Sequence, residues 1–120
     1  MQNLEQVRAK NAMDVKIERE EKDSKSIAKK VPTMILENGL IGAAAFALES
    51  NVKGYRCVFE NGIIKHLADK DISLLPGTNT SLEGFIRDLT AISSAKLRMV
   101  TAEVLAYMNY LRRFAKGGKA

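Results

Sequence analysis

Residues 100–116 constrain the fold most, because they join an apolar stripe to a basic end. Apolar side chains there follow the i, i+3, i+4, i+7 spacing of one buried helix face: Val104, Tyr107, Met108, Leu111, Phe114 and Ala115. Thr101 stands at the expected N-cap, Glu103 lies in the expected first turn, and Gly117-Gly118 are expected to end the helix. The pattern predicts a helix that packs into a bundle and presents a cationic end.

The basic end has two interpretations. Arg112, Arg113 and Lys116 in a last turn offset the helix dipole, an effect of about 0.3–1 kcal/mol that is common in unrelated proteins. They are also suited to bind a polyanion. Residues 96–120 hold six basic residues and one acidic residue, whereas residues 1–95 hold thirteen of each. Such clustering is more typical of nucleic-acid binding than a diffuse excess of positive charge.

Size and cysteine content indicate a simple organisation. A chain of 120 residues with a net charge of +5 is expected to form one domain, residues 1–120, which buries its core without disulfides or metal. Cys57 is the only cysteine and is predicted to be a small core residue, as expected in a reducing cytoplasm. The charged start lacks a signal sequence, and the uncharged run 38–48 is too short to span a bilayer. We therefore expect a soluble cytoplasmic protein with no membrane partner.

Further helices are predicted along the chain. Residues 2–30 read as one long helix with few apolar positions, which Pro32 should end at Lys30 or Val31. A short helix is then expected to end at Asn38-Gly39, where the glycine suits either a C-cap or a kink. A central helix should follow from Leu40 to Glu49.

The second half of the chain contains one ambiguous segment. Residues 54–75 suit either a helix or a hairpin that turns at Asn61-Gly62. Thr80-Ser81-Leu82-Glu83 reads as a capping box that starts an amphipathic helix. A loop at residues 93–98 is expected to lead to the last helix.

Candidate catalytic residues are few. His66, the only histidine, lies near Asp69 and Asp71, and this trio is the basis for one alternative, a small ribonuclease. A metal nuclease needs more convergent carboxylates, and a histidine nuclease usually needs a second base. We favour a surface histidine beside solvated acids. No catalytic residue, metal site or cofactor is predicted, and the chain is not expected to be an enzyme.

Three stretches together resemble a known family: NLEQVRAKNA at 3–12, KKVPTMILENGLIGAAAFAL at 29–48, and LRMVTAEVLAYMNYLRRFAK at 97–116. Their order and separation are similar to those of the small helical subunit of the type III-B CRISPR effector, the Cmr complex. The most specific parts are residues 31–40 and 101–115. They are packing and surface patterns rather than a catalytic signature.

This resemblance implies an all-α, single-domain bundle of about five to six helices with a long N-terminal helix, in which residues 54–71 are helical. It implies no catalytic activity. Copies would stack head to tail as an inner filament beside the backbone subunits that hold the guide RNA. They would contact the large subunit and neighbouring copies. They would also help hold the duplex of guide and target RNA through its backbone, while other subunits cleave the target in antiviral defence.

The resemblance also ranks the candidate RNA-binding residues. Arg112, Arg113 and Lys116 match the basic ending of the family and come first. The other candidates, two before the same helix and three in the first predicted helix, are Lys96, Arg98, Lys10, Lys29 and Lys30. Tyr107 and Tyr110 could stack on bases, although packing within the protein is favoured. A helical adaptor that binds only protein is the main alternative function.

Overall fold

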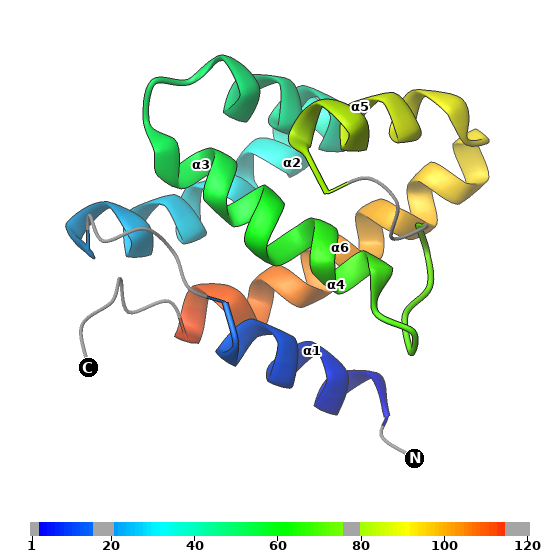
Figure 1. The fold of residues 1–120 in the computed structure, drawn as a ribbon, viewed down its shortest axis with the longest axis horizontal. Coiled ribbons are helices and arrows are strands. Elements are labelled where there is room, and N and C mark those ends of the chain that lie inside the picture. The colour runs from blue at the N-terminus through cyan, green and yellow to red at the C-terminus, as the bar shows by residue number, and fades with distance from the viewer. Residues whose placement is uncertain (1–2, 16–20, 76–79, 115–120) are drawn as a thin grey trace.

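The structure is a computed structural model and describes residues 3–15, 21–75 and 80–114. Within these residues all regular structure is helical, so the predicted all-α class is confirmed. The elements, in chain order, are α1 (Leu4–Met13), α2 (Glu21–Glu49), α3 (Lys53–Cys57), the π-helical η1 (Val58–Ile63), α4 (Ile64–Ala68), α5 (Leu82–Ala91) and α6 (Ser94–Phe114) (Figure 1). Because α3, η1 and α4 follow one another without a gap, the described residues form five helical segments.

Helix α6 packs against α1, α2, η1 and α4. Its predicted apolar stripe is confirmed at Val104, Tyr107, Met108 and Leu111, which are at most 1% exposed. Phe114 is 38% exposed and therefore does not continue the buried face. Ala115, Lys116 and Gly117-Gly118 lie outside the described residues.

The predicted start of α6 was wrong. The helix begins at Ser94, so the loop expected at residues 93–98 is mostly helical. The Ser93 hydroxyl accepts a hydrogen bond from the Lys96 amide at 3.1 Å, as an N-cap side chain does. Thr101 lies inside the helix, where its hydroxyl donates to the Leu97 carbonyl at 2.7 Å. Ser93 and Thr101 are both suitable N-cap residues, and in the structure Ser93 is the cap.

The helix predicted over residues 2–30 is divided in the structure. Helix α1 begins after Asn3, whose side chain and that of Gln6 form a reciprocal capping box, and it ends at Met13. The long helix of this half of the chain is α2, which starts at Glu21. Residues 16–20 lie outside the described residues.

Pro32 does not end a helix, contrary to the prediction, because α2 continues through it. A proline inside a helix costs roughly 3 kcal/mol. Ile27, Val31 and Ile35 on the same helix are at most 3% exposed, and burial of each contributes about 1.5–3 kcal/mol. Tertiary packing therefore outweighs the local penalty. The break instead falls at Gly39 (φ 83°, ψ 164°), so the predicted division of residues 32–49 at Asn38-Gly39 is confirmed as a kink.

The segment from Lys53 to Ala68 is helical, which excludes the hairpin alternative. At the end of η1, the Ile64 amide bonds to the Phe59 carbonyl five residues earlier, the spacing of a π-helix. Asn61-Gly62 thus lies in a widened helical turn rather than a β-turn. In the next helix, α5, the N-cap is Ser81 and not the predicted Thr80, since the Ser81 hydroxyl accepts from the Gly84 amide at 3.1 Å.

One hydrophobic core includes buried residues of α1 to α6, and its large rings include Phe59, Phe85 and Tyr107. Cys57 is buried, as predicted. The stretch Ser26–Glu49 of α2 is long and apolar enough to cross a membrane, a criterion that core helices of soluble proteins also meet. Here α2 packs against α3, α5, η1 and α6, while Leu36 and Phe46 of the same helix stay exposed.

The backbone of Gly39 generates the first testable prediction. Its φ and ψ lie in a region that is essentially restricted to glycine, and a Cβ there would meet nothing within 4 Å. Gly39→Ala should therefore lower the free energy of unfolding by about 1–3 kcal/mol through backbone strain alone. Urea unfolding followed by circular dichroism measures this loss. The exposed neighbour Glu37→Ala serves as control, and equal midpoints for the two variants would contradict the assignment.

Candidate functional site

The predicted RNA-binding residues are largely at the surface. Of the eight, seven lie in the described residues: Lys96 is half-buried, and the others are exposed, namely Lys10, Lys29, Lys30, Arg98, Arg112 and Arg113. Lys116 lies outside the described residues. No ion pair involves these seven within the described part of the chain. Their charges are therefore available to an anionic ligand.

The structure does not bring all of these cations together. Lys96 and Arg98 lie at the start of α6, whereas Arg112 and Arg113 lie near its end. With a rise of 1.5 Å per residue, the two pairs are roughly 20–25 Å apart along the helix. In Figure 1 the end of α6 and the start of α2 lie on the same side of the molecule, and the start of α6 lies on the opposite side. The candidates thus form at least two separate groups.

Arg56, which is not in the predicted set, is engaged in two ion pairs. Arg56 contacts Glu60 at 3.1 Å and Glu83 at 2.6 Å on the surface. Glu60 also accepts a hydrogen bond from the Leu82 amide at 2.7 Å, which joins η1 to the start of α5. These contacts hold the helices in place, and the charge of Arg56 is balanced within the protein.

The structure contains a network of buried polar side chains around Glu103, which the sequence analysis missed. Arg8 on α1 donates two hydrogen bonds of 2.8 Å to the two carboxylate oxygens of Glu103 on α6. His66 Nε2 on α4 lies 2.8 Å from Glu103 Oε2. Glu103 is 8% exposed and His66 only 1%. A single carboxylate thus joins three helices.

The hydrogen-bond pattern assigns the tautomer of His66. The Asn11 amide nitrogen lies 2.9 Å from His66 Nδ1 and donates to Asp69 Oδ2 at 3.2 Å. An amide nitrogen is a donor, so Nδ1 acts as an acceptor and the proton is on Nε2, which donates to Glu103. His66 is therefore held in its neutral form. A second proton on Nδ1 would face the Asn11 donor.

Burial and hydrogen bonding shift the pKa values of this network. Burial lowers the pKa of His66 below its ordinary value of 6.5, although the hydrogen bond to Glu103 acts in the opposite direction. Burial alone would raise the pKa of Glu103, but the hydrogen bonds from Arg8 and His66 outweigh it. The net pKa of Glu103 lies below 4.5. At neutral pH the network thus consists of charged Arg8 and Glu103 with neutral His66.

Tyr107 and Tyr110, the two residues considered for base stacking, contact other side chains of the protein. The ring of Tyr107 stacks on that of His66, with centroids 4.2 Å apart and an interplanar angle of 14°. Tyr107 is fully buried, so the prediction that it packs in the core is confirmed. Tyr110 is half-buried, and its hydroxyl donates to Glu5 on α1 at 3.3 Å.

The sequence also matches a protein family. The model of the CRISPR-associated protein family Cas_Cmr5 matches residues 4–118. The chain belongs to the Cmr5 family. No curated protein and no solved structure matches it significantly. The family supports a role as a CRISPR-associated component of a Cmr complex, and membership implies association with other Cmr proteins.

For this Cmr5-family chain, the prediction of a surface histidine beside solvated acids was wrong. His66 is buried, and Asn11 joins it to Asp69, while Asp71 is exposed. A usable signal was present in the sequence. Val100, Glu103, Val104 and Tyr107 have the i, i+3, i+4, i+7 spacing of one helix face, so Glu103 stands within the apolar stripe. A charge in that position predicts a buried partner.

Loss of the Glu103 carboxylate should destabilise the fold strongly. Glu103→Ala leaves the Arg8 guanidinium without its partner and removes the acceptor of His66, which costs about 3 kcal/mol for a mostly buried pair. Chemical unfolding measures the change. Glu83→Ala removes the exposed partner of Arg56 and should leave the midpoint nearly unchanged. Similar losses in the two variants would show that the network contributes little.

Acidification should weaken the fold through His66. The pKa of His66 is lower in the folded chain, so just below pH 6.5 the unfolded chain takes up a proton that the folded chain does not. The free energy of unfolding should therefore fall as the pH drops below about 6.5. Glu103, with its lowered pKa, adds a further loss only below about pH 4.5.

Urea midpoints at a series of pH values between 7.5 and 5 test this dependence. His66 is the only histidine, so His66→Gln should flatten the curve over this interval. A midpoint that does not change with pH in the wild-type chain would contradict a lowered pKa.

Proposed function

We propose that this chain is a non-catalytic subunit of a type III-B CRISPR effector, in which copies stack as an inner filament. In this role it helps hold the duplex of guide and target RNA for cleavage by other subunits, in cytoplasmic antiviral defence. Its partners are the guide and target RNA, the backbone and large Cmr subunits, and neighbouring copies. Family membership and the all-helical fold support this proposal.

The observation that carries RNA contact is the exposed basic end of α6. Arg112 and Arg113 are exposed and without ion pairs in the described residues, and Lys116 follows them in sequence. Cations of this kind bind phosphates without reading bases, which suits a subunit that holds any guide–target duplex. One copy offers few such cations, but several copies aligned along one duplex multiply weak sites.

The contacts of His66 with other side chains support a non-catalytic role. General acid or base catalysis requires a group that reaches the substrate. Both ring nitrogens of His66 are within hydrogen-bond distance of Asn11 and Glu103, and its ring stacks on Tyr107. Within the described residues no group of three or more histidine, cysteine, aspartate or glutamate side chains is arranged to hold a metal ion.

A protein-only adaptor is the second candidate, and exposed apolar side chains favour it. Leu36, Met13 and Met99 are 73%, 65% and 58% exposed, and a partner protein that covered them would remove this apolar surface from water. The adaptor and the RNA-holding subunit differ in one respect: only the latter contributes to RNA affinity.

Removal of the basic end tests the proposal. In a complex assembled with the Arg112→Ala, Arg113→Ala, Lys116→Ala variant, the affinity for a guide–target duplex should fall. The log–log salt slope should decrease by up to about 0.9 for each phosphate that the variant no longer neutralises. Filter binding across a salt series measures both quantities, with complex lacking this chain as reference.

The matched control neutralises three exposed cations elsewhere: Lys53, Lys70 and Arg87. This control has the same net charge as the test variant, so a general loss of positive charge would affect both equally. Unchanged affinity and slope in the test variant would eliminate the basic end as an RNA surface. Unchanged binding without the chain would favour the adaptor.

A further inference from the structure

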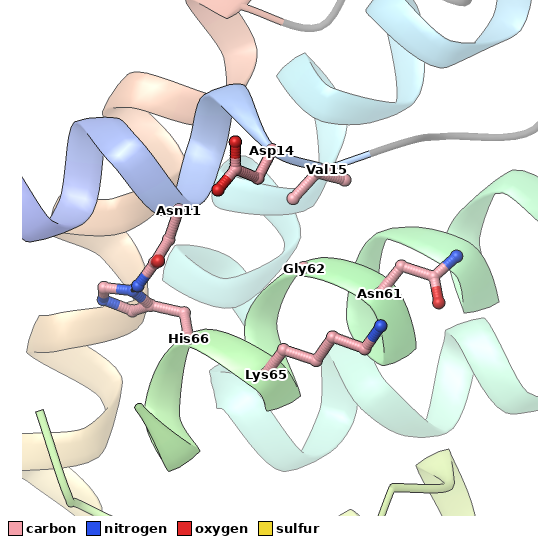
Figure 2. A pocket seen from close by; sticks show the side chains of 7 residues that line it. All are labelled: Asn11, Asp14, Val15, Asn61, Gly62, Lys65 and His66. Carbon is pink, nitrogen blue, oxygen red and sulfur yellow. The ribbon is translucent and has the colours of Figure 1, made fainter. Parts of the chain in front are cut away.

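A pocket of about 420 Å³ lies between the end of α1 and the η1–α4 segment. Figure 2 shows side chains of Asn11, Asp14 and Val15 from the α1 side opposite Asn61, Lys65 and His66, with Gly62 between them. The volume is within the range of small-ligand sites, about 300–1,000 Å³. None of these residues belongs to the predicted basic set.

The two walls of the pocket carry complementary polar groups. On the α1 side, Asp14 offers a carboxylate. The Asn11 amide nitrogen is used by His66 and Asp69, so its oxygen remains as an acceptor. On the other side, Lys65 is exposed and offers an ammonium group. Neither Asp14 nor Lys65 has an ion-pair partner among the described residues.

The pocket has no free aromatic surface for a nucleobase. His66 is the only aromatic residue among the described lining residues. Its ring stacks on Tyr107 and its nitrogens are engaged by Asn11 and Glu103. Base stacking is therefore not the means of recognition here, and the ligand must be held through polar groups.

A buried hydroxyl borders the same pocket. Tyr107 is 0% exposed, and its hydroxyl has no hydrogen-bond partner in the described part of the structure. A Cβ on Gly62 would lie 3.1 Å from this oxygen and 3.6 Å from Val15 Cγ2. Gly62 and Val15 both line the pocket, and the hydroxyl packs behind them, close to the place that a side chain at Gly62 would fill. The glycine therefore allows Tyr107 to pack directly under this wall of the pocket.

We infer that this pocket binds one ribose–phosphate unit of RNA. Asp14 and Asn11 accept hydrogen bonds from the ribose hydroxyls, and Lys65 contacts the adjacent phosphate. Carboxylates bind ribose hydroxyls in this way in dinucleotide sites, and an ammonium group is a suitable point charge for phosphate. Recognition of the 2′-hydroxyl distinguishes RNA from DNA. The inference rests on the proposed function for its choice of RNA and adds a second, sugar-specific contact.

Nucleotide titration of the isolated full chain tests the pocket directly. In amide NMR spectra, adenosine 5′-monophosphate should shift the signals of Asp14, Asn61, Gly62 and Lys65. Uridine 5′-monophosphate should do the same, because the base is not held. The 2′-deoxy analogue should bind about tenfold more weakly, the factor expected for removal of one hydrogen bond to a charged group.

Matched variants identify the groups that bind. Asp14→Asn should reduce the ribose-to-deoxyribose preference, and Lys65→Gln should weaken both nucleotides alike. Glu37→Gln and Lys53→Gln make the same charge changes on exposed residues that do not line the pocket, and should alter neither.

Each other outcome overturns the inference. Absence of shifts would leave the pocket without a nucleotide, and equal shifts from both sugars or from inorganic phosphate alone would exclude ribose recognition. Loss of subunit co-purification in Asp14→Asn, without any nucleotide effect, would assign the pocket to a protein interface. The titration reports on the pocket alone, whereas duplex filter binding reports on the proposed function, so the two can fail independently.

Discussion

The hydrogen bonds that join charged Arg8 and Glu103 to neutral His66 determine how α1 sits on the rest of the fold. Helix α1 lies closely along α6 but buries only two apolar side chains, Val7 and Ala12. Two hydrogen bonds of 2.8 Å to a carboxylate that is nearly removed from water supply a directional attachment. That attachment in turn holds the α1 side of the polar pocket opposite η1 and α4. The candidate ligand site thus depends on a structural ion pair.

Local periodicity was sufficient to predict several parts of the fold. The apolar stripe of α6 and the break at Gly39 follow from spacing and from glycine's backbone freedom, which act within a few residues. The limits of helices were less predictable. Ser93 and Thr101 both carry a hydroxyl that can cap a helix, so the sequence alone does not show which one does. Pro32 lies inside a helix because the packing of its neighbours offsets the free energy that a proline costs there. The helical state of residues 54–71 came from the family resemblance, since periodicity left it open.

In the candidate site, too, some features could be predicted from sequence and others could not. Arg112 and Arg113 are exposed, as expected for charged residues beyond an apolar stripe, while their binding of RNA stays a prediction. The buried network was not predicted because its partners are remote: Arg8 and Glu103 are 95 residues apart in sequence, and Asn11 and His66 are 55 apart. Residue spacing within one helix contains no information on such pairings. Only the position of Glu103 within the stripe indicated that a partner exists.

The π-helical turn η1 has a consequence for the register of the chain. A π-turn accommodates one residue more than an α-turn, and each residue of an α-helix advances about 100° around the axis. A single extra residue in an unbroken α-helix would therefore rotate everything after it by that angle, whereas the widened turn at Val58–Ile63 takes up one residue within the turn itself. Deletion of one residue there, with conversion of the turn to α-helix, would leave α4 facing in nearly the same direction, with His66 still toward Glu103 and Tyr107. The π-turn thus tolerates a change of one residue in length without a change in the direction of α4.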